Sequence, residues 1–415
     1  MYTLNYKNFT PWWLMVLVAL LMMSVKVAFA QRGADEPRVD KEGVIEAEIV
    51  GHVFKPATRE PTEARVNSLQ TAENIEISLF CDGMEKPRMM VVREDGTIYL
   101  TGRPDKVVMM KDLDQDGRAD VHKVVLEKKG AHGLALNNGK LYLVTVNEVY
   151  EMDLMEDGTP GEPRKIIEDL PDGGQHANRT MAFGPDGQLY ISVGSTCNAC
   201  EETRAENATI VVAEPGTWER KIFARGLRNT IGFDWHPQTG ELWGMDHGID
   251  WLGDTEQKEE LNRIEQNQHY GWPYVYGEGK RNPADEPPKG ISYAEFEDST
   301  RMPIMSLPAH CAPLDMVFIN SDHFPESWQG DAIVTLHGSW NRKQPSGYKI
   351  VRIHFDDEGR PDRYTDLVSG FLVENNTAQF GRVVGLATLA DGSLLVSDDS
   401  GGMVYRISYN DGMGR

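Results

Sequence analysis

Histidine and arginine residues recur in this chain just before runs of alternating apolar residues. His176 lies in the glycine-rich stretch 173–179, and Arg228 lies beside Asn229 in a Gly-Leu-Arg-Asn turn. An imidazole can act as a general base near neutral pH, and a guanidinium can hold a carboxylate or stabilise a developing oxyanion. Each also has a structural interpretation: a histidine satisfied by backbone hydrogen bonds, which is the commoner case, or an arginine that caps strand ends.

Four further basic residues occupy comparable places. His132 and Arg382 precede apolar runs, and His337 and Arg342 begin and end a polar cluster that follows another such run. If these runs are the inner strands of a closed β-structure, the residues at their ends converge on one axis. We therefore expect one small-molecule site that is rich in histidine and arginine.

An acidic loop gives a separate signal. Its carboxylates stand at positions 1, 3, 5 and 9 of a calcium-binding loop, with glycine at position 6; they are Asp112, Asp114, Asp116 and Asp120. Position 12 is Lys123 instead of glutamate, so the EF-hand pattern is incomplete. The loop predicts a structural calcium site, with an acidic, solvated turn as the alternative.

The elements that must position these residues form a repeat. A strand of alternating apolar residues meets a turn with glycine, and a second, more apolar strand follows; the six instances cover residues 89–100, 134–143, 181–191, 231–245, 316–334 and 386–396. Asp-Gly and Asn-Gly pairs suit hairpin turns, because these residues tolerate positive φ. The spacing of the first four turns matches a four-stranded blade. We predict an all-β fold, a six-bladed β-propeller.

One interval in the repeat is much longer than the others. It separates the turn at Gly240 from the turn at Gly330, and we interpret it as an insertion between blades 4 and 5, around residues 250–309. Helix signals are weak everywhere except at about residues 254–266. The insertion is therefore expected to contain a short helix.

The N-terminus has the pattern of a secretory leader. An apolar run at residues 12–25 precedes the small-x-small cleavage signal at 28–30, so residues 1–30 are predicted to be a signal peptide. The run is short for a bilayer span and Lys26 interrupts it, which makes an uncleaved anchor the second interpretation. Residues 31–71 form a polar N-terminal segment, and residues 72–415 the propeller domain. We expect an exported protein, periplasmic or extracellular.

Cysteine usage and charge agree with export. Cys197 and Cys200 could form a local disulfide, which leaves Cys81 and Cys311 to pair or to stay free. Glu201 follows Cys200 where a haem-attachment motif needs histidine, so electrons would have to leave to a separate acceptor. The formal net charge of −22 argues against nucleic acid as a partner.

An ordered set of motifs resembles a known family. The motifs are GQH at 174–176, FGPDG at 183–187, GLRN at 226–229, WGMDHG at 243–248, ELN at 260–262, HYGWP at 269–273, LHGSWNR at 336–342 and DD at 398–399. Together they are similar to the glucose/sorbosone dehydrogenase family, and most similar to its sorbosone-dehydrogenase-like branch, over about residues 75–409. The resemblance implies a soluble six-bladed propeller that uses pyrroloquinoline quinone and calcium.

The resemblance also implies roles for single residues. His176 matches the catalytic base that takes the proton of the substrate hydroxyl. Arg228 matches the arginine that polarises the quinone, with Asn229 beside it. Gly248 and Ile249 match the positions whose backbone carbonyls hold the calcium ion of the cofactor.

Three positions depart from the family pattern. The acidic partner of the base is replaced by Ser195, and the cofactor lysine by His337. Arg382 matches the first of two arginines that bind the cofactor carboxylates, but the second is replaced by Val384. These changes leave glucose unsupported as the substrate. The residues that could substitute in cofactor binding are His132, His337 and Arg342.

The hypothesis that follows is a quinoprotein dehydrogenase that oxidises a sugar or sugar-derived aldehyde or alcohol and passes electrons to an external acceptor. Two alternatives stay open. One is a metal-dependent lactonase on a similar propeller, which needs several channel carboxylates around one metal. The other is a propeller that has lost its cofactor and serves as a binding module.

Overall fold

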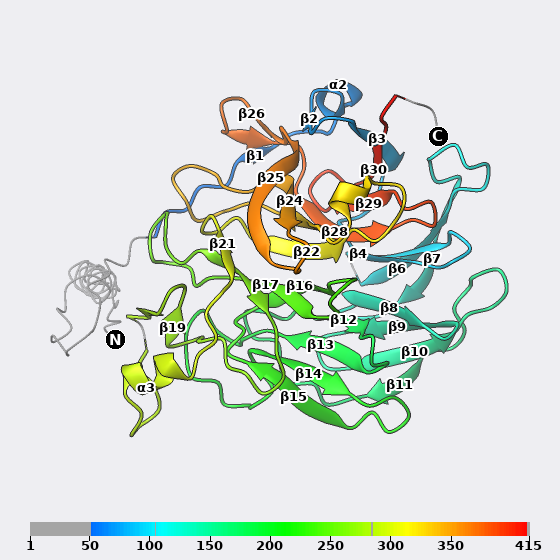
Figure 1. Ribbon diagram of the computed structural model, residues 1–415. Helices are drawn as coiled ribbons and strands as arrows, with labels where there is room; N and C mark the ends of the chain where they lie inside the picture. Colours follow the sequence, from blue (N-terminus) through cyan, green and yellow to red (C-terminus); the bar gives the residue numbers. More distant parts are fainter. Residues whose placement is uncertain (1–50, 104, 284, 413–415) are drawn as a thin grey trace, which may run out of the picture. The chain divides into compact units, whose positions relative to one another are not determined.

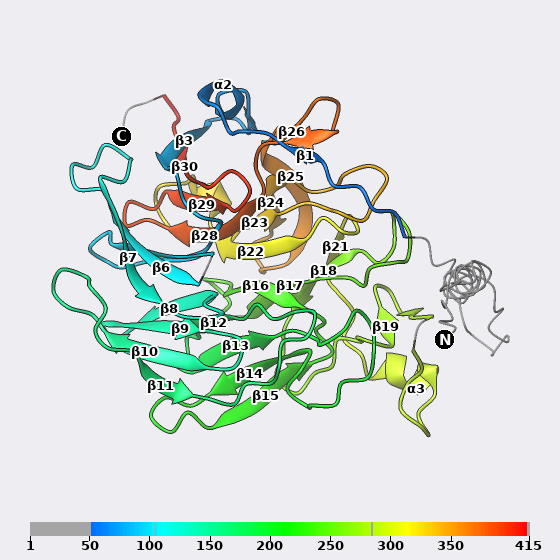
Figure 2. The same ribbon diagram turned by 180° about the vertical axis from the view of Figure 1, so that it is seen from behind.

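The fold is built almost entirely from β-strands. The computed structural model describes residues 51–103, 105–283 and 285–412, and all of them belong to one compact unit. Thirty strands, two short α-helices and one 3₁₀ helix are assigned in this part of the chain. Five of its sheets contain four antiparallel strands and a sixth contains five; the six follow one another in chain order, as in the blades of a propeller (Figures 1 and 2).

We number the blades 1 to 6. Blade 1 comprises β4 (Pro87–Val92), β5 (Ile98–Gly102), β6 (Lys106–Lys111) and β7 (Val121–Glu127). Blade 2 comprises β8 (Gly133–Asn137), β9 (Lys140–Val144), β10 (Val149–Asp153) and β11 (Arg164–Ile167). Blade 3 comprises β12 (Thr180–Phe183), β13 (Leu189–Val193), β14 (Thr209–Ala213) and β15 (Arg220–Arg225). Blade 4 comprises β16 (Thr230–Trp235), β17 (Leu242–Asp246), β18 (Glu259–Arg263) and β21 (Met305–Leu307); blade 5, β22 (Pro313–Phe318), β23 (Ala332–Leu336), β24 (Lys349–Phe355) and β25 (Pro361–Ser369); blade 6, β28 (Val383–Thr388), β29 (Leu394–Asp398), β30 (Met403–Tyr409) and β3 (Ile75–Cys81).

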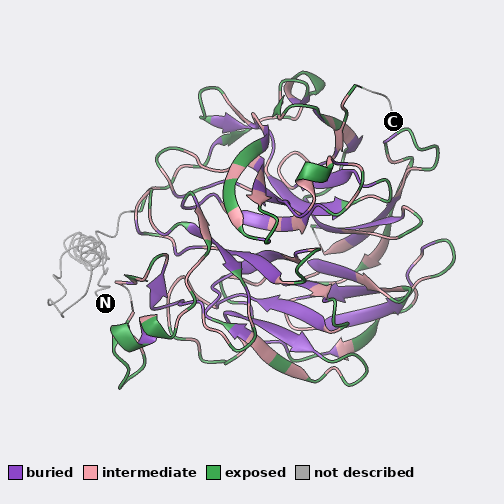
Figure 3. Cartoon of the chain, viewed as in Figure 1, coloured by how far each residue is buried: buried purple, intermediate pink, exposed green. Residues whose placement is uncertain are grey.

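The six predicted hairpins are the first two strands of the six blades. Each turn is closed by a glycine of left-handed conformation, with φ between 71° and 86°; the six are Gly96, Gly139, Gly187, Gly240, Gly330 and Gly392. A side chain is disfavoured at such φ, which explains why glycine recurs there. The strands themselves are largely buried (Figure 3). The prediction of an all-β, six-bladed fold is confirmed.

Hydroxyl groups connect neighbouring blades. In four blades a Ser or Thr on the second strand donates a hydrogen bond to a carbonyl at the start of the next blade: Thr101 to His132 O, Ser192 to Thr230 O, Thr335 to Val384 O and Ser397 to Arg88 O. Each bond satisfies a backbone group that lies outside its own sheet. Because the bonds recur at the same register, they hold the ends of the inner strands in similar positions around the ring.

The first strands of all six blades line a cavity of about 310 Å³. Two of its carboxylates bridge inner strands: Asp315 accepts from Leu386 N at 2.8 Å, and Asp234 accepts from Phe318 N at 2.8 Å. Burial raises the pKa of Asp315 to about 8 and that of Asp234 to about 6. Both carboxylates therefore serve first as connectors between blades 4, 5 and 6.

The insertion lies inside blade 4, between β18 and β21, and not between blades 4 and 5. It contains the β19 (Val275–Tyr276)–β20 (Lys280–Arg281) hairpin and α3 (Tyr293–Asp298), which begins with a capping box. The helix predicted at about residues 254–266 is wrong, because residues 259–263 form β18. Glu259 and Glu260 bind backbone N–H groups of Gly248 and Gly277, so tertiary contacts override the helical propensity of this stretch.

The described part of the N-terminal segment runs along blades 5 and 6. β1 (Ala57–Thr58) pairs with β27 (Ala378–Gln379), which also pairs with β26 (Leu372–Val373); α2 (Glu63–Val66) follows, and β2 (Gln70–Thr71) joins β25 as a fifth strand of blade 5. The 3₁₀ helix η1 (Glu326–Trp328) lies between β22 and β23. The predicted leader, 1–30, lies outside the described residues. Within those residues no helix has the length and apolarity needed to cross a bilayer.

Candidate active site

One end of the ring collects the charged residues singled out from the sequence. We call it the upper face: there the first strand of each blade begins and the second strand ends. Its polar residues come from all six blades and include Arg88, His132, His176, Arg228, Asn229, His247, His337, Arg382 and Asp399. Many of them are buried, so their hydrogen bonds decide which atoms are left for a ligand.

His176 precedes β12 and has one ring nitrogen engaged. Its Nδ1 lies 3.0 Å from Ser195 O and 2.8 Å from Ser195 Oγ. A carbonyl only accepts, so Nδ1 carries the proton and Nε2 is the unprotonated nitrogen. Burial, together with the charge of Arg228 and the ring of His247, lowers the pKa of His176 to about 2. The imidazole is therefore neutral near pH 7, and Nε2 carries a lone pair.

Arg228 lies next to His176 in the buried centre of this face, 3% exposed. Its Nε donates to Asn198 O at 2.9 Å, and its Nη2 donates to Asn198 Oδ1 at 2.7 Å and to Asp250 at 3.3 Å. Within the described residues no hydrogen bond involves Nη1. The guanidinium is thus held along one edge, and Nη1 is the donor left for a ligand.

Asn229 and His247 complete this half of the site. Asn229 Nδ2 donates to His247 Nδ1 at 3.2 Å, and His247 Nε2 donates to Pro313 O at 2.5 Å. The carboxylate of Asp246 fixes the turn that carries Arg228 and Asn229, because it accepts hydrogen bonds from the backbone N–H groups of both residues. Asn229 Oδ1 is buried and accepts no hydrogen bond from the described residues, so it is available to accept one from a ligand.

The opposite half is held by an ionic contact across three blades. Asp399 accepts from Arg88 Nη1 at 2.7 Å and from His337 Nε2 at 2.9 Å. Burial opposes the ionisation of Asp399, but the contacts with His337 and Arg88 keep its pKa well below the usual range. Arg88 Nη2 also donates to His132 Nε2 at 3.3 Å, while His132 Nδ1 donates to Arg179 O. Both nitrogens of His132 are thus used inside the protein.

The remaining basic candidates lie near the blade 5 loop that follows β23. Arg382 donates to His337 O and to Gly338 O, and Arg342 Nη1 donates to Ala309 O at 2.9 Å. Arg342 Nε is buried without a partner in the described chain. Asn341 links this loop to blade 4 through a 2.6 Å hydrogen bond to Asp250. His337 shares the partner Asp399 with Arg88, and Arg382 donates to His337 O, whereas no hydrogen bond of Arg342 leads to this group within the described residues.

Gly248 and Ile249 form a carbonyl-bearing turn after β17. Their N–H groups are fixed by Glu259 Oε2 at 2.8 Å and by Gln257 Oε1 at 3.1 Å. Their carbonyl oxygens accept no hydrogen bond within the described residues. Burial raises the pKa of Glu259 to about 8, so this carboxyl group is protonated over part of the neutral range.

The acidic loop lies at the other end of the ring, between β6 and β7. Carboxylate oxygens of Asp112, Asp114 and Asp116 lie within 4.8 Å of one another. Asp120 instead accepts from the backbone N–H groups of Leu113 and Asp114 and shapes the turn. The loop is thus separate from the upper face, and calcium binding there stays a prediction.

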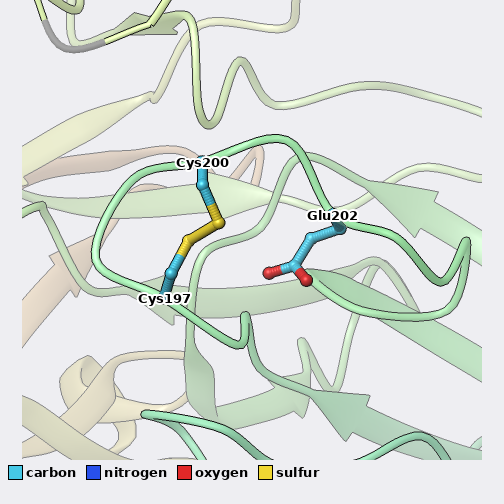
Figure 4. Close-up of side chains that lie close together, drawn as sticks. All are labelled: Cys197, Cys200 and Glu202. Carbon is cyan, nitrogen blue, oxygen red and sulfur yellow. A yellow bond between two sulfur atoms is a disulfide. The ribbon is translucent and has the colours of Figure 1, made fainter.

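A disulfide joins Cys197 to Cys200 on the upper face, whereas Cys81 and Cys311 are free and buried. Glu202 lies beside the bridge (Figure 4), where its carboxylate accepts from Thr196 N and Thr196 Oγ1. Disulfide sulfurs are poor metal ligands, so we interpret this group as structural.

The family assignment follows from a match over most of the chain. The family model described as TrAA12-like matches residues 69–410. The chain belongs to the TrAA12-like family. This assignment confirms the resemblance to soluble quinone-dependent sugar dehydrogenases.

Named relatives are distant but cover most of the chain. A Borreliella burgdorferi protein described as uncharacterized is 29% identical over 365 residues, which are 84% of this chain and 92% of the relative. A Hypocrea jecorina protein named pyrroloquinoline quinone-dependent sugar dehydrogenase is 24% identical over 406 residues, 83% of this chain and 90% of the relative.

Two solved structures show the shared fold. The calcium structure of the Trichoderma reesei AA12 protein has a TM-score of 0.73 at 21% identity, and it covers 82% of this chain and 97% of its own. The holo form of the pyranose dehydrogenase PQQ domain from Coprinopsis cinerea has a TM-score of 0.70 at 20% identity, with 86% and 100% covered.

Several site residues had no role assigned from the sequence. Asp399 stands in a motif only, and no sequence pattern points to Arg88, Asp250 or Asn198 as site residues. Arg88 is the second residue of β4 and matches Val384 of β28 in register, so it stands inside the first strand of its blade, whereas Arg228 and Arg382 precede theirs. Asn198 has no comparable signal, because its role depends on a loop that folds across to blade 4.

Proposed function

We propose that the protein is a quinoprotein dehydrogenase that oxidises a sugar or sugar-derived aldehyde or alcohol, of aldose or sorbosone type, with pyrroloquinoline quinone and calcium. The observation that supports it best is His176, whose Nε2 is unprotonated while a buried guanidinium stands beside it. A neutral base next to a fixed positive charge is suited to removing a proton from a hydroxyl group.

The donors of the upper face fit an anionic quinone. Arg88 Nε and Arg342 Nε are buried and have no partner in the described residues, and Arg228 keeps Nη1 free. Arginine N–H groups match carboxylate oxygens in geometry and charge. Val384, at the second arginine position, packs in an apolar cluster with Met89, so positive charge on that side comes from Arg88 and Arg382.

The turn at Gly248 and Ile249 fits the calcium ion. Calcium prefers oxygen ligands, and backbone carbonyls are common among them. The N–H groups of both residues are anchored to side chains, which fixes the peptide planes while leaving both carbonyl oxygens without a protein donor. We assign Gly248 O and Ile249 O as the protein ligands.

The chemistry divides between cofactor and protein. When bound, pyrroloquinoline quinone supplies the hydride acceptor. His176 Nε2 takes the hydroxyl proton, and the hydrogen bonds of Nδ1 to Ser195 hold the imidazole in the required tautomer. Arg228 and Asn229 orient the polar groups of the bound ligands beside His176. Electrons leave to an external acceptor, which the chain itself does not identify.

Reconstitution tests the proposal. Purified protein with calcium and pyrroloquinoline quinone should show a changed quinone absorbance and reduce a dye with an aldose or sorbosone. His176→Gln should keep quinone affinity and lose about 10²- to 10⁴-fold in turnover, the range for a general base. His354→Gln, at the end of β24 that is remote from the upper face, is the matched control. Absence of both quinone binding and dye reduction in the unaltered protein would refute the function.

Two related points belong to the same proposal. Apart from the disulfide group, no trio of His, Cys, Asp or Glu ligand atoms converges on the upper face within the described residues, which gives a metal-dependent lactonase no support. We also infer export to the periplasm or the exterior, because the leader pattern is joined by the Cys197–Cys200 disulfide.

A further inference from the structure

The chain between β13 and β14 carries a four-residue ring closed by a disulfide. Cys197 and Cys200, whose Cα atoms are 6.2 Å apart, enclose Asn198 and Ala199. We call residues 197–200 the cystine loop (Figure 4). It lies on the upper face, two residues after Ser195, and it contacts Arg228 directly and His176 through Ser195.

The first contact is with Arg228. Asn198 supplies two acceptors to one guanidinium: its carbonyl oxygen receives Nε at 2.9 Å, and its Oδ1 receives Nη2 at 2.7 Å. Two parallel hydrogen bonds fix the plane of a guanidinium as well as its position. Asn198 therefore determines where the free Nη1 of Arg228 points.

The second contact reaches His176 through Ser195. The Ser195 hydroxyl donates to Cys197 O at 2.7 Å, and it lies 2.8 Å from His176 Nδ1. Because the hydroxyl hydrogen is directed at the Cys197 carbonyl, its lone pair faces His176 and accepts from Nδ1. The carbonyl of Cys197 thus helps to select the tautomer that leaves Nε2 as a base.

The loop is also anchored away from the site. Asn198 Oδ1 accepts from Asp250 N at 2.9 Å, and Asn198 O accepts from Trp272 Nε1 at 3.2 Å. Cys197 and Ala199 pack against an apolar cluster that contains Trp272. These anchors come from blade 4 and its insertion, so the cystine loop of blade 3 is fixed to the neighbouring blade.

We propose that the cystine loop is the shared positioning element of the active site: Asn198 holds the guanidinium of Arg228, Cys197 O orients His176 through Ser195, and the disulfide keeps both acceptors in register. The inference rests on the proposed function. It adds that the cystine loop positions both the base His176 and the cation Arg228. A change in the loop should therefore displace both residues together.

Substitutions of Asn198 test the arginine contact with the disulfide intact. Asn198→Ala should weaken quinone binding or lower turnover by about 10- to 100-fold, the effect of losing a hydrogen bond to a charged group. Asn198→Asp keeps an oxygen acceptor for Arg228 and should restore quinone affinity to within a few fold. Glu201→Gln, an exposed neighbour, is the matched control and should behave as the unaltered protein.

The double variant Cys197→Ser/Cys200→Ser tests the ring itself, without quinone. In apoprotein labelled with ¹⁵N-arginine and ¹⁵N-histidine, we expect the Arg228 Nε–H signal to lose its protection from exchange. We also expect His176 to populate both tautomers. The signals are assigned by their loss in Arg228→Gln and His176→Gln, and calorimetry of each variant reports whether the fold is intact.

The outcomes separate the two ideas. If the unaltered protein binds no quinone, the proposed function fails, while the apoprotein spectra still decide the role of the loop. If the double-serine variant folds and keeps both the Arg228 protection and the single His176 tautomer, the positioning role is overturned. Quinone affinity and turnover that are both equal in Asn198→Ala and the unaltered protein would overturn it as well.

Discussion

Replacing Asp399 by asparagine should destabilise the propeller. The carboxylate accepts from Arg88 at 2.7 Å and from His337 at 2.9 Å, and the Arg88 and Asp399 side chains are only 9% and 18% exposed. Asp399→Asn leaves the Arg88 guanidinium buried without a counter-charge. Loss of one partner from a buried pair costs about 3–5 kcal/mol.

This magnitude converts into a temperature shift. An unfolding entropy of about 2.1 cal/mol/K per residue, over roughly 340 residues of propeller, gives about 0.7 kcal/mol/K. A loss of about 4 kcal/mol therefore lowers Tm by about 6 °C. Calorimetry of the apoprotein at neutral pH measures the shift. The double variant Arg88→Met/Asp399→Asn removes both charges and should recover a large part of it.

Two results would refute this prediction. A Tm for Asp399→Asn within about 1 °C of the unaltered protein would show that the pair is solvated and contributes little, as exposed ion pairs do. A double variant that falls by the sum of the two single changes would show that Arg88 and Asp399 are not coupled.

Three further predictions follow from the same structure. Ser195→Asp places a carboxylate beside His176 Nδ1, which favours the imidazolium and should move the acidic limb of the kcat/KM profile to higher pH. Burial lowers the pKa of His132 to about 3, so between pH 3 and 6.5 the unfolded chain binds more protons than the folded one, and stability rises with pH. His132→Gln should reduce that slope by up to about 1.4 kcal/mol per pH unit. Denaturant unfolding at several pH values measures the slope. Calcium should raise Tm through the acidic loop, and the increase measured with and without chelator should shrink in Asp112→Asn/Asp116→Asn.

The sequence was sufficient for the blades, because each hairpin combines a period of two with a glycine turn, and both are local properties. It was insufficient for β18. The run around Glu259 and Glu260 has helical propensity, and only their buried contacts with backbone N–H groups of distant residues make it a strand. The position of the insertion was misplaced for the same reason, since the third strand of blade 4 was not recognised.

The site shows the same division. His176, Arg228 and Arg382 could be singled out because each stands within four residues before the first strand of its blade. Their partners could not, since Arg88 and Asp399 are 311 residues apart in the chain and meet only when the ring closes. The hydrogen bonds of Asn198 depend on how a short loop lies against the next blade, which no periodic pattern encodes.

Blade 6 combines β3, near the start of the described chain, with β30 at its end, so that Ile75 pairs with Tyr409. This arrangement has a kinetic consequence. The outer strand β3 has no partner in the last blade until β30, near the end of the chain, is available, and closing so long a loop is slow. Until then the unpaired edges of β3 are a template for other strands. The protein should therefore depend on being kept unfolded, or shielded, until its C-terminal strands are released, and loss of either terminal strand should open the ring.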